Sequence, residues 1–164
     1  GRPDRFPGVR GRSVAGETWF RDAIRLRGDD YVPGDVRRET QLGGAQVSTY
    51  AAGIYETEGG PACGAPAIHV DWAAQARAIV EGVRIAQAER ARTRVLLVDA
   101  QNRVLAASDG RGALTETLAA DLHGRESGLV RDPRTGAVTA FHRTPGYETY
   151  RGLGWYGVIV RGGA

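Results

Sequence analysis

Short strand-like segments, separated by turns rich in Gly and Pro, recur along this chain in two groups on either side of a helical segment. The first group covers residues 31–38, 46–55 and 65–72. Val, Ile, Thr and aromatic residues favour extended structure, and Gly and Pro mark the turns. The pattern predicts an α+β fold built on antiparallel sheets flanked by helices. The second group comprises residues 94–99, 103–108, 128–131, 137–143 and 155–161.

The segment between the two groups has the period of an amphipathic helix. Asp71 stands at the N-cap position, where its carboxylate can accept otherwise unpaired amide hydrogens. We expect this helix to run to about Ala91, and we expect shorter helices over residues 17–26 and 114–123. Its apolar residues recur at intervals of three and four, which places them on one face: Trp72, Ala76, Ile79, Val80 and Val83.

The second group has the order β-β-α-β-β-β, which is the order of a PAS-like core with a five-stranded antiparallel sheet around a small cavity. The first group has the order α-β-β-β followed by a helix, which is the same order without two opening strands. We therefore expect an incomplete first PAS-like unit at residues 1–72, a connecting helix at 73–92 and a second PAS-like unit at 93–161.

The charge pattern argues against a nucleic-acid partner. All 22 basic residues are Arg, and they are spread among 19 acidic residues for a net charge of +3. A nucleic-acid surface would need the arginines clustered on one face. No apolar run approaches the ~20 residues needed to cross a bilayer. Because the chain has no Met, we expect it to be a segment of a longer protein.

Catalytic and metal-binding motifs are missing from the sequence. It has no G-x-S-x-G, H-E-x-x-H or C-x-x-C pattern, and without Lys it cannot form a P-loop. The three histidines, His69, His123 and His142, lack the short spacing of metal ligands. The single Cys63 cannot form an internal disulfide. We therefore expect no enzyme activity, no cofactor and no metal.

Four segments resemble the extracytoplasmic Cache sensor family, whose PAS-like domains belong to methyl-accepting chemotaxis proteins and sensor kinases. E-T-W-F-R-D-A-I (17–24) resembles the W-Y-x-x-A helix of the family, and residues 47–72 resemble its strand–turn–strand that ends in a ligand-facing Asp. Residues 94–109 and 141–160 resemble the opening and closing hairpins of a second module. The resemblance implies a periplasmic ligand-sensing domain, attached to the membrane through flanking segments, that binds a small molecule.

The amino-acid-binding pattern of that family is matched only in part. Trp19 and Asp71 match in type, and Phe20 is an aromatic replacement. The family has an Arg two residues before the Trp, where this chain has Glu17, and a Tyr five residues further back, where this chain has Arg12. The resemblance thus implies a sensor whose ligand does not present a free carboxylate at this position.

Five residues are the candidate ligand site of the first unit. Strand alternation places His69 and Asp71 on one face, and we expect Tyr50 to approach them from a neighbouring strand. Trp19 and Phe20 would cover this face. The alternatives stay open: Asp71 as a helix cap, His69 as a structural residue and the three aromatic residues as core.

In the closing hairpin, the aromatic cluster is interpreted as packing over the second unit, and Arg143 could reach a second cavity or lie on the surface. A different function also stays open, an intracellular PAS-like regulatory domain in which the apolar helix stripe is a dimer seam. A homodimer is therefore an open expectation. The cluster consists of Tyr147, Tyr150, Trp155 and Tyr156.

Overall fold

The computed structural model describes residues 7–28, 30–122, 124–146 and 152–162, and Tyr147, Tyr150 and His123 lie outside these ranges. The chain divides into two compact units, Gly1–Ala73 and Ala74–Ala164. Both contain antiparallel sheets with few helices, so the predicted α+β fold class is confirmed. The three-part division at residues 72 and 92 stays a prediction.

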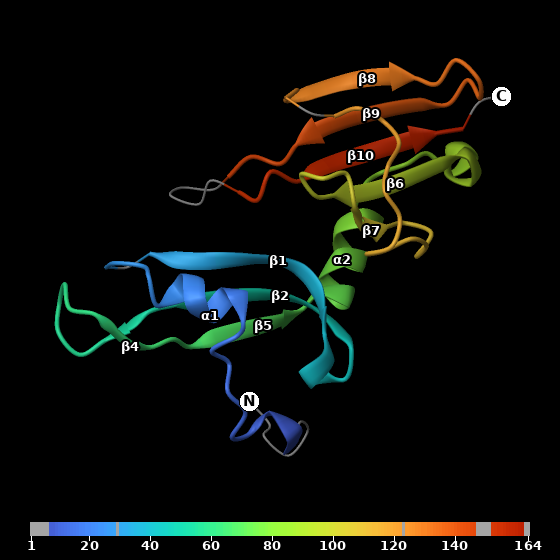
Figure 1. The fold of residues 1–164 in the computed structure, drawn as a ribbon. Coiled ribbons are helices and arrows are strands. Elements are labelled where there is room, and N and C mark those ends of the chain that lie inside the picture. Colours follow the sequence, from blue (N-terminus) through green and yellow to red (C-terminus); the bar gives the residue numbers. More distant parts are fainter. Residues whose placement is uncertain (1–6, 29, 123, 147–151, 163–164) are drawn as a thin grey trace. The chain divides into compact units, whose positions relative to one another are not determined.

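The first unit is built on a three-stranded antiparallel sheet of order β1-β2-β5 (Figure 1). Its strands are β1 (Tyr31–Glu39), β2 (Ala45–Ala52) and β5 (Ala67–Asp71). The register of β1 shifts between Pro33 and Val36. A Pro residue has no N–H to donate, which fits its place on an edge strand. A two-stranded ribbon, β3 (Ile54–Tyr55) with β4 (Ala62–Gly64), extends the β2–β5 connection.

Helix α1 (Thr18–Ala23) contacts β1 and β2 and covers one face of this sheet (Figure 1). It is shorter than the helix expected over residues 17–26. Glu17 at its N-cap makes no side-chain cap hydrogen bond, and Gly28 has a φ of 63° in the turn that follows. Short 3₁₀ helices, η2 (Pro7–Val9) and η3 (Thr40–Leu42), stand before α1 and after β1.

Helix α2 (Trp72–Glu81) follows β5 directly and ends ten residues earlier than predicted. Gly82, the next residue, is a poor helix former, and a 3₁₀ helix η4 (Gln87–Arg92) occupies part of the remaining segment. The predicted apolar stripe is also too wide. Trp72, Ala76 and Val80 are buried, whereas Ile79 and Val83 are exposed, because only positions four residues apart face the protein here.

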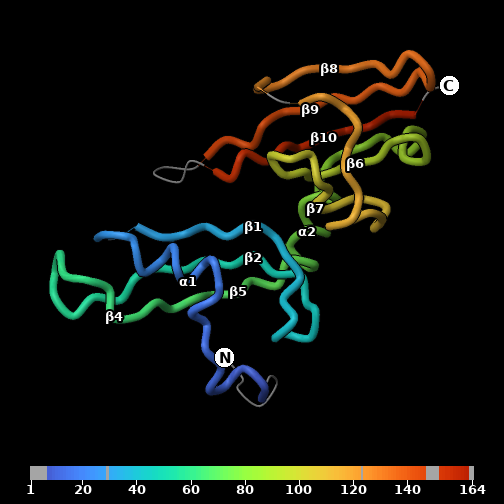
Figure 2. Tube along the Cα trace, viewed as in Figure 1, coloured from blue at the N-terminus to red at the C-terminus, as the bar shows by residue number. Residues whose placement is uncertain are grey.

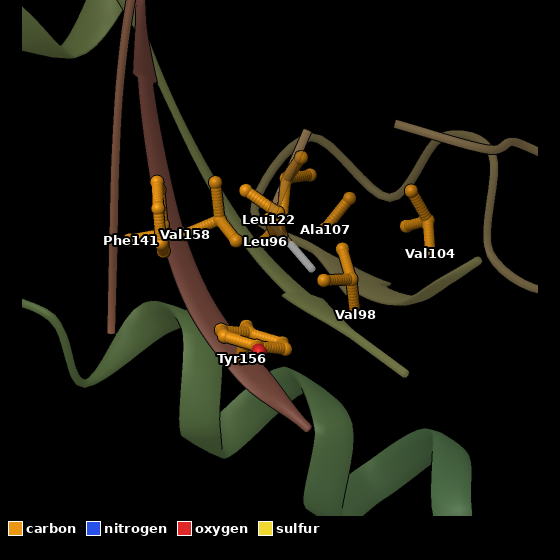
Figure 3. Close-up of a cluster of buried hydrophobic side chains, with 8 residues drawn as sticks. All are labelled: Leu96, Val98, Val104, Ala107, Leu122, Phe141, Tyr156 and Val158. Carbon is orange, nitrogen blue, oxygen red and sulfur yellow. The ribbon is translucent and has the colours of Figure 1, made fainter. Parts of the chain in front are cut away.

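The second unit has a five-stranded antiparallel sheet of order β7-β6-β10-β9-β8, which confirms the predicted strands (Figure 1). One face carries a core of eight buried side chains, drawn in Figure 3. The strands are β6 (Thr93–Val98), β7 (Val104–Ala107), β8 (Ser127–Arg131), β9 (Val138–Arg143) and β10 (Tyr156–Arg161). The core residues are Leu96, Val98, Val104, Ala107, Leu122, Phe141, Tyr156 and Val158.

The helix predicted over residues 114–123 is wrong. The described part of the β7–β8 connection is irregular, as the trace in Figure 2 shows, and Leu114 has a φ of 63°, outside the helical region. Arg94 holds this connection from β6, with its guanidinium 3.0 Å from Asp109 and 2.7 Å from Glu116. No helix in the described part of the chain is long and apolar enough to span a membrane.

Candidate functional site

A cavity of about 250 Å³ lies in the first unit, beside α1. Its wall joins an aromatic ring, aliphatic side chains and two carboxylates. Apolar walls with a few convergent polar groups are typical of small-molecule sites. The lining residues are Val9, Val14, Glu17, Trp19, Glu39, Gln41, Leu42, Ala67 and His69.

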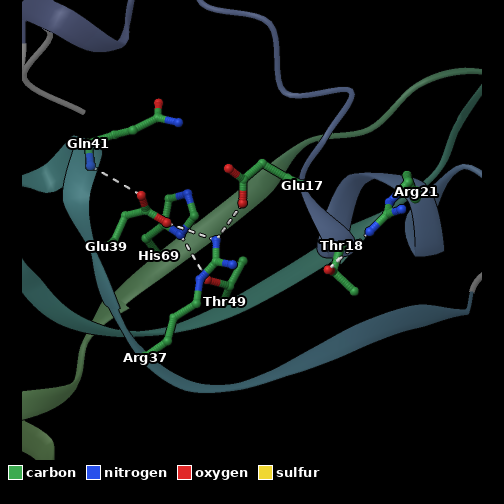
Figure 4. A network of polar contacts seen from close by, with 8 residues as sticks. All are labelled: Glu17, Thr18, Arg21, Arg37, Glu39, Gln41, Thr49 and His69. Carbon is green, nitrogen blue, oxygen red and sulfur yellow. Dashed lines mark hydrogen bonds and ion pairs between the residues drawn. The ribbon is translucent and has the colours of Figure 1, made fainter.

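An ion-pair network forms the polar side of this cavity (Figure 4). One nitrogen of Arg37, from β1, lies 3.0 Å from a Glu17 oxygen and 2.8 Å from a Glu39 oxygen. The Glu39 side chain is only 9% exposed, and its second oxygen accepts a hydrogen bond from the Gln41 backbone N–H at 3.2 Å. Two carboxylates thus share one guanidinium, which leaves the network with an excess negative charge.

His69 reaches the cavity from β5. Its Nδ1 lies 2.9 Å from the Thr49 hydroxyl, on the directly paired residue of β2. Burial lowers the pKa of His69 below its ordinary value; Glu39 opposes this shift, Arg37 adds to it and Glu17 opposes it. The imidazole is therefore neutral at pH 7 and adds no positive charge to offset the carboxylates.

Of the two aromatic residues of α1, only Trp19 contacts this polar group. The Trp19 and His69 rings pack edge to face, with centroids 6.2 Å apart. Phe20 packs on Trp19 in the same manner at 5.8 Å but does not line the cavity. Trp19 therefore forms part of the cavity wall, and Phe20 packs against Trp19 without lining the cavity.

Two other predicted site residues, Asp71 and Tyr50, do not line the cavity. Asp71 shares the face of His69, and its Oδ1 accepts a hydrogen bond from the Ala73 backbone N–H at 3.2 Å, as an N-cap does. Tyr50 pairs with Ile68, so it belongs to the opposite face of the sheet, where its ring lies 6.4 Å from Tyr31. The expectation that Tyr50 converges with His69 and Asp71 is wrong, because the register places it one residue out of phase.

Three residues of this site were not predicted from the sequence: Arg37, Glu39 and Thr49. Arg37 and Glu39 are two residues apart on β1, which is the signal that could have placed them on one face. Pro33 and Gly34 concealed that alternation by making the segment look irregular. Among the described residues, no group of three His, Cys, Asp or Glu side chains is placed to hold a metal ion.

Comparison of the sequence finds no matching family model and no matching curated protein. Solved structures do match. The ligand-binding domain of the Pseudomonas aeruginosa PAO1 amino acid chemoreceptor PctC, in complex with GABA, aligns with a TM-score of 0.66 at 18% identity and covers 93% of this chain and 63% of its own. This chain has the fold of a Cache sensor domain. The predicted Cache, PAS-like fold is therefore confirmed.

Two further neighbours have the same Cache fold. The ligand-binding domain of the Pseudomonas fluorescens chemoreceptor CtaA, in complex with L-leucine, has a TM-score of 0.60 at 12% identity, over 93% of this chain and 61% of its own. The sensor domain of the V. cholerae histidine kinase DctB has a TM-score of 0.58 at 14% identity, over 94% of this chain and 63% of its own. The chain described here thus spans less than two thirds of the length of each neighbour.

Proposed function

We propose that this chain is the sensory ligand-binding part of a bacterial chemoreceptor or sensor kinase, located on the periplasmic side of the membrane. Its ligand is a small extracellular solute with a cationic or hydroxyl end, bound in the cavity of the first unit. The observation that carries the proposal is the Trp19-walled cavity over the Glu17–Arg37–Glu39 network.

Charge favours a cation in this cavity. Glu17 and Glu39 outnumber the single guanidinium of Arg37, and the pKa of His69 is lowered so that this ring is neutral. Each carboxylate oxygen can accept more than one hydrogen bond, so the ion pairs leave acceptor capacity for a ligand amine or hydroxyl. Trp19 also lines the cavity, and an indole ring can attract a cation to its face.

A ligand carboxylate finds poor support at the same place. The Cache resemblance assigns an Arg to the position of Glu17, and here the Nη2 of the nearby Arg37 already pairs with two carboxylates. A third carboxylate would compete with both and add repulsion. This distinguishes the proposed ligand class from the GABA and L-leucine bound by PctC and CtaA.

Signalling would follow from differential binding to two states of the first unit. Glu17 precedes α1, whereas Arg37 and Glu39 belong to β1, so a ligand that contacts these carboxylates bridges a helix and a sheet. A ligand that fits one helix position better shifts the population toward that position. The receptor output, chemotaxis or kinase, would read that shift.

Thermal stability of the 164-residue chain in a panel of putrescine, choline, ethanolamine, glycerol and GABA tests the proposal. An amine at a hundred times its Kd should stabilise the first unit by about 2.7 kcal/mol. Hits are then measured by calorimetry. GABA carries a carboxylate as well as an ammonium group, whereas the other four compounds carry no carboxylate. Binding of GABA without binding of any of these four would contradict the proposed ligand class.

Glu17→Gln is the matched site variant, because it removes one charge and keeps the shape of the side chain. It should weaken amine binding about tenfold or more, since a hydrogen bond to a charged group contributes roughly 1.5–3 kcal/mol. Glu56→Gln is the control, as Glu56 is exposed in the same unit and does not line the cavity. Equal affinities of the two variants for the amine would show that the ligand does not bind in this cavity.

An intracellular regulatory domain that works by dimerising is the second candidate. The exposed side chains of Ile79 and Val83 on α2 favour it, because apolar residues exposed together on a helix can form a dimer seam. Light scattering of the wild-type chain and of Ile79→Glu separates the two candidates. A dimer that this substitution converts to a monomer, without any ligand response, would favour dimerisation.

A further inference from the structure

A second cavity, of about 560 Å³, lies entirely within the second unit, at one end of the five-stranded sheet. Strand β9 ends there at Arg143, and β10 begins there at Tyr156. The volume lies within the roughly 300–1,000 Å³ typical of small-molecule sites. The lining residues are Ala100, Gly124, Arg125, Glu126, Arg143, Thr144, Pro145, Gly146, Gly154 and Tyr156.

The sheet register directs Arg143 toward this cavity. Arg143 pairs with Tyr156, and Phe141 pairs with Val158 two residues earlier on β9. Directly paired residues share a face, so Arg143 continues the row of core side chains beyond its buried end. Figure 3 shows three of these residues, Phe141, Tyr156 and Val158, on that common face.

The guanidinium of Arg143 has no ion pair or side-chain hydrogen bond within the described ranges of the chain. Two other arginines of this unit are paired with carboxylates: the guanidinium of Arg94 with Asp109 and Glu116, and that of Arg161 with Glu89. Arg143 therefore presents an unoccupied fork of N–H donors to the cavity, a geometry suited to a carboxylate.

Gly154 borders this fork in a backbone conformation that favours glycine. Gly154 has a φ of 73°, and a Cβ at this position would lie 3.6 Å from a terminal nitrogen of Arg143 and 3.5 Å from Cβ of Ala100. These are ordinary contact distances, so the left-handed backbone, and not a lack of space, favours glycine beside the guanidinium.

The remaining charged residues of the cavity determine which charge of anion it can balance. Arg125 is held over the Phe141 ring at 4.8 Å, and its guanidinium donates to the Asp121 carbonyl. Glu126, next in the chain, adds one negative charge. Among the described lining residues, two arginines against one carboxylate leave a net charge of +1, which a monoanion balances and a dianion exceeds.

We propose that this cavity is a second ligand site, which takes a small monocarboxylate on the free guanidinium of Arg143. It is separate from the amine site proposed in the first unit, since the two share no residue. A two-unit sensor with sites of opposite charge preference could respond to two solutes.

Titration of the isotopically labelled 164-residue chain by NMR tests this site. The probes are the sodium salts of acetate, propionate, lactate and pyruvate, with succinate and phosphate as dianionic comparators and sodium chloride at matched ionic strength. We expect saturable shifts of amides near residues 124–126, 143–146 and 154–156 with at least one monocarboxylate. Absence of such shifts for all four monocarboxylates up to about 10 mM, ten times a Kd of 1 mM, would overturn the proposal.

Arg143→Gln should weaken this binding about 10- to 100-fold, the loss expected for a hydrogen bond to a charged group. Arg131→Gln is the control, because Arg131 is exposed on β8 and does not line the cavity. Dispersed amide signals in both variants report that the fold is intact. Equal weakening in the two variants would reduce the effect to net charge and refute the site.

Two further outcomes would also overturn it. Tighter binding of succinate or phosphate than of every monocarboxylate would exclude a monoanion site. Monocarboxylate shifts that respond to Glu17→Gln but not to Arg143→Gln would place the anion in the first unit. The amine test of the first unit does not depend on either result.

Discussion

Replacing Arg37 with Gln removes the guanidinium that pairs with two carboxylates at the first-unit cavity. The Arg37 side chain is 37% exposed, that of Glu17 is 29% exposed and that of Glu39 is 9% exposed. Removing one partner costs about 0–1 kcal/mol at an exposed pair and about 3–5 kcal/mol at a buried one. This network lies between those limits, so we expect Arg37→Gln to lower the free energy of unfolding by about 1–3 kcal/mol.

Arg38→Gln is the matched control on the neighbouring residue. Arg38 is exposed, and its guanidinium donates only a long hydrogen bond, 3.4 Å, to the Gly44 carbonyl. This substitution should change the free energy of unfolding by no more than about 0.5 kcal/mol. Both variants carry the same change in net charge, so any difference between them reports the local contacts.

Native-state hydrogen exchange of the β2 amides is the appropriate assay, because the two units need not unfold together. Exchange in β2 should accelerate about 5- to 150-fold in Arg37→Gln and change little in Arg38→Gln. In the double variant Arg37→Gln, Glu39→Gln the loss should be smaller than in Arg37→Gln alone, because no enclosed charge is left unpaired. Equal exchange in the two single variants would refute the network as a source of stability.

Three further predictions follow from burial, pKa and capping. The folded-state pKa of His69 is lowered below 6.5, so its stabilising contribution is present above about pH 6.5 and is lost as the pH falls through the folded pKa. The urea midpoint of the wild type should therefore fall as the pH is lowered from 8 to 5, and the midpoint of His69→Gln should fall less. Leu96→Ala, at 1% exposure, should cost about 2.7–5 kcal/mol, whereas Leu129→Ala, at 64% exposure, should cost under about 1 kcal/mol by urea unfolding. Asp71→Asn should leave stability nearly unchanged, because Asn and Asp cap about equally well, and should weaken binding of a cationic ligand less than Glu17→Gln does in calorimetry, because Asp71 does not line the cavity; equal weakening by the two substitutions would place Asp71 in the binding site.

The strands of the second unit could be predicted because their determinants are local. The run Val95–Val98 and the turn at Asp132–Gly136 each carry their own signal of extension or reversal. The segment 114–122 could not be predicted, since its form depends on Arg94, which pairs with Glu116 from 22 residues away. Such a long-range contact can override local helix propensity, and the sequence of the segment itself does not reveal it.

The candidate site was predictable to a similar extent. The meeting of Trp19 with His69 followed from the Cache resemblance and from strand alternation, and the structure confirms their contact. The side of the sheet that Tyr50 faces depends on cross-strand register, and a shift of one residue reverses it. The role of Arg37 depends on a partner 20 residues earlier in the chain, which spacing alone does not reveal.

The place of β10 in the second sheet has a consequence for vectorial synthesis. This strand is the last of the described elements to leave the ribosome, yet it lies between β6 and β9 and pairs with both. Until it arrives, the β6–β7 and β8–β9 hairpins have no strand to join them and expose the edges that it will fill. The pairing partners within the three-stranded sheet of the first unit are all complete by residue 71. The nascent chain should therefore form its first unit before the second, and close the second unit only after Arg161 has emerged.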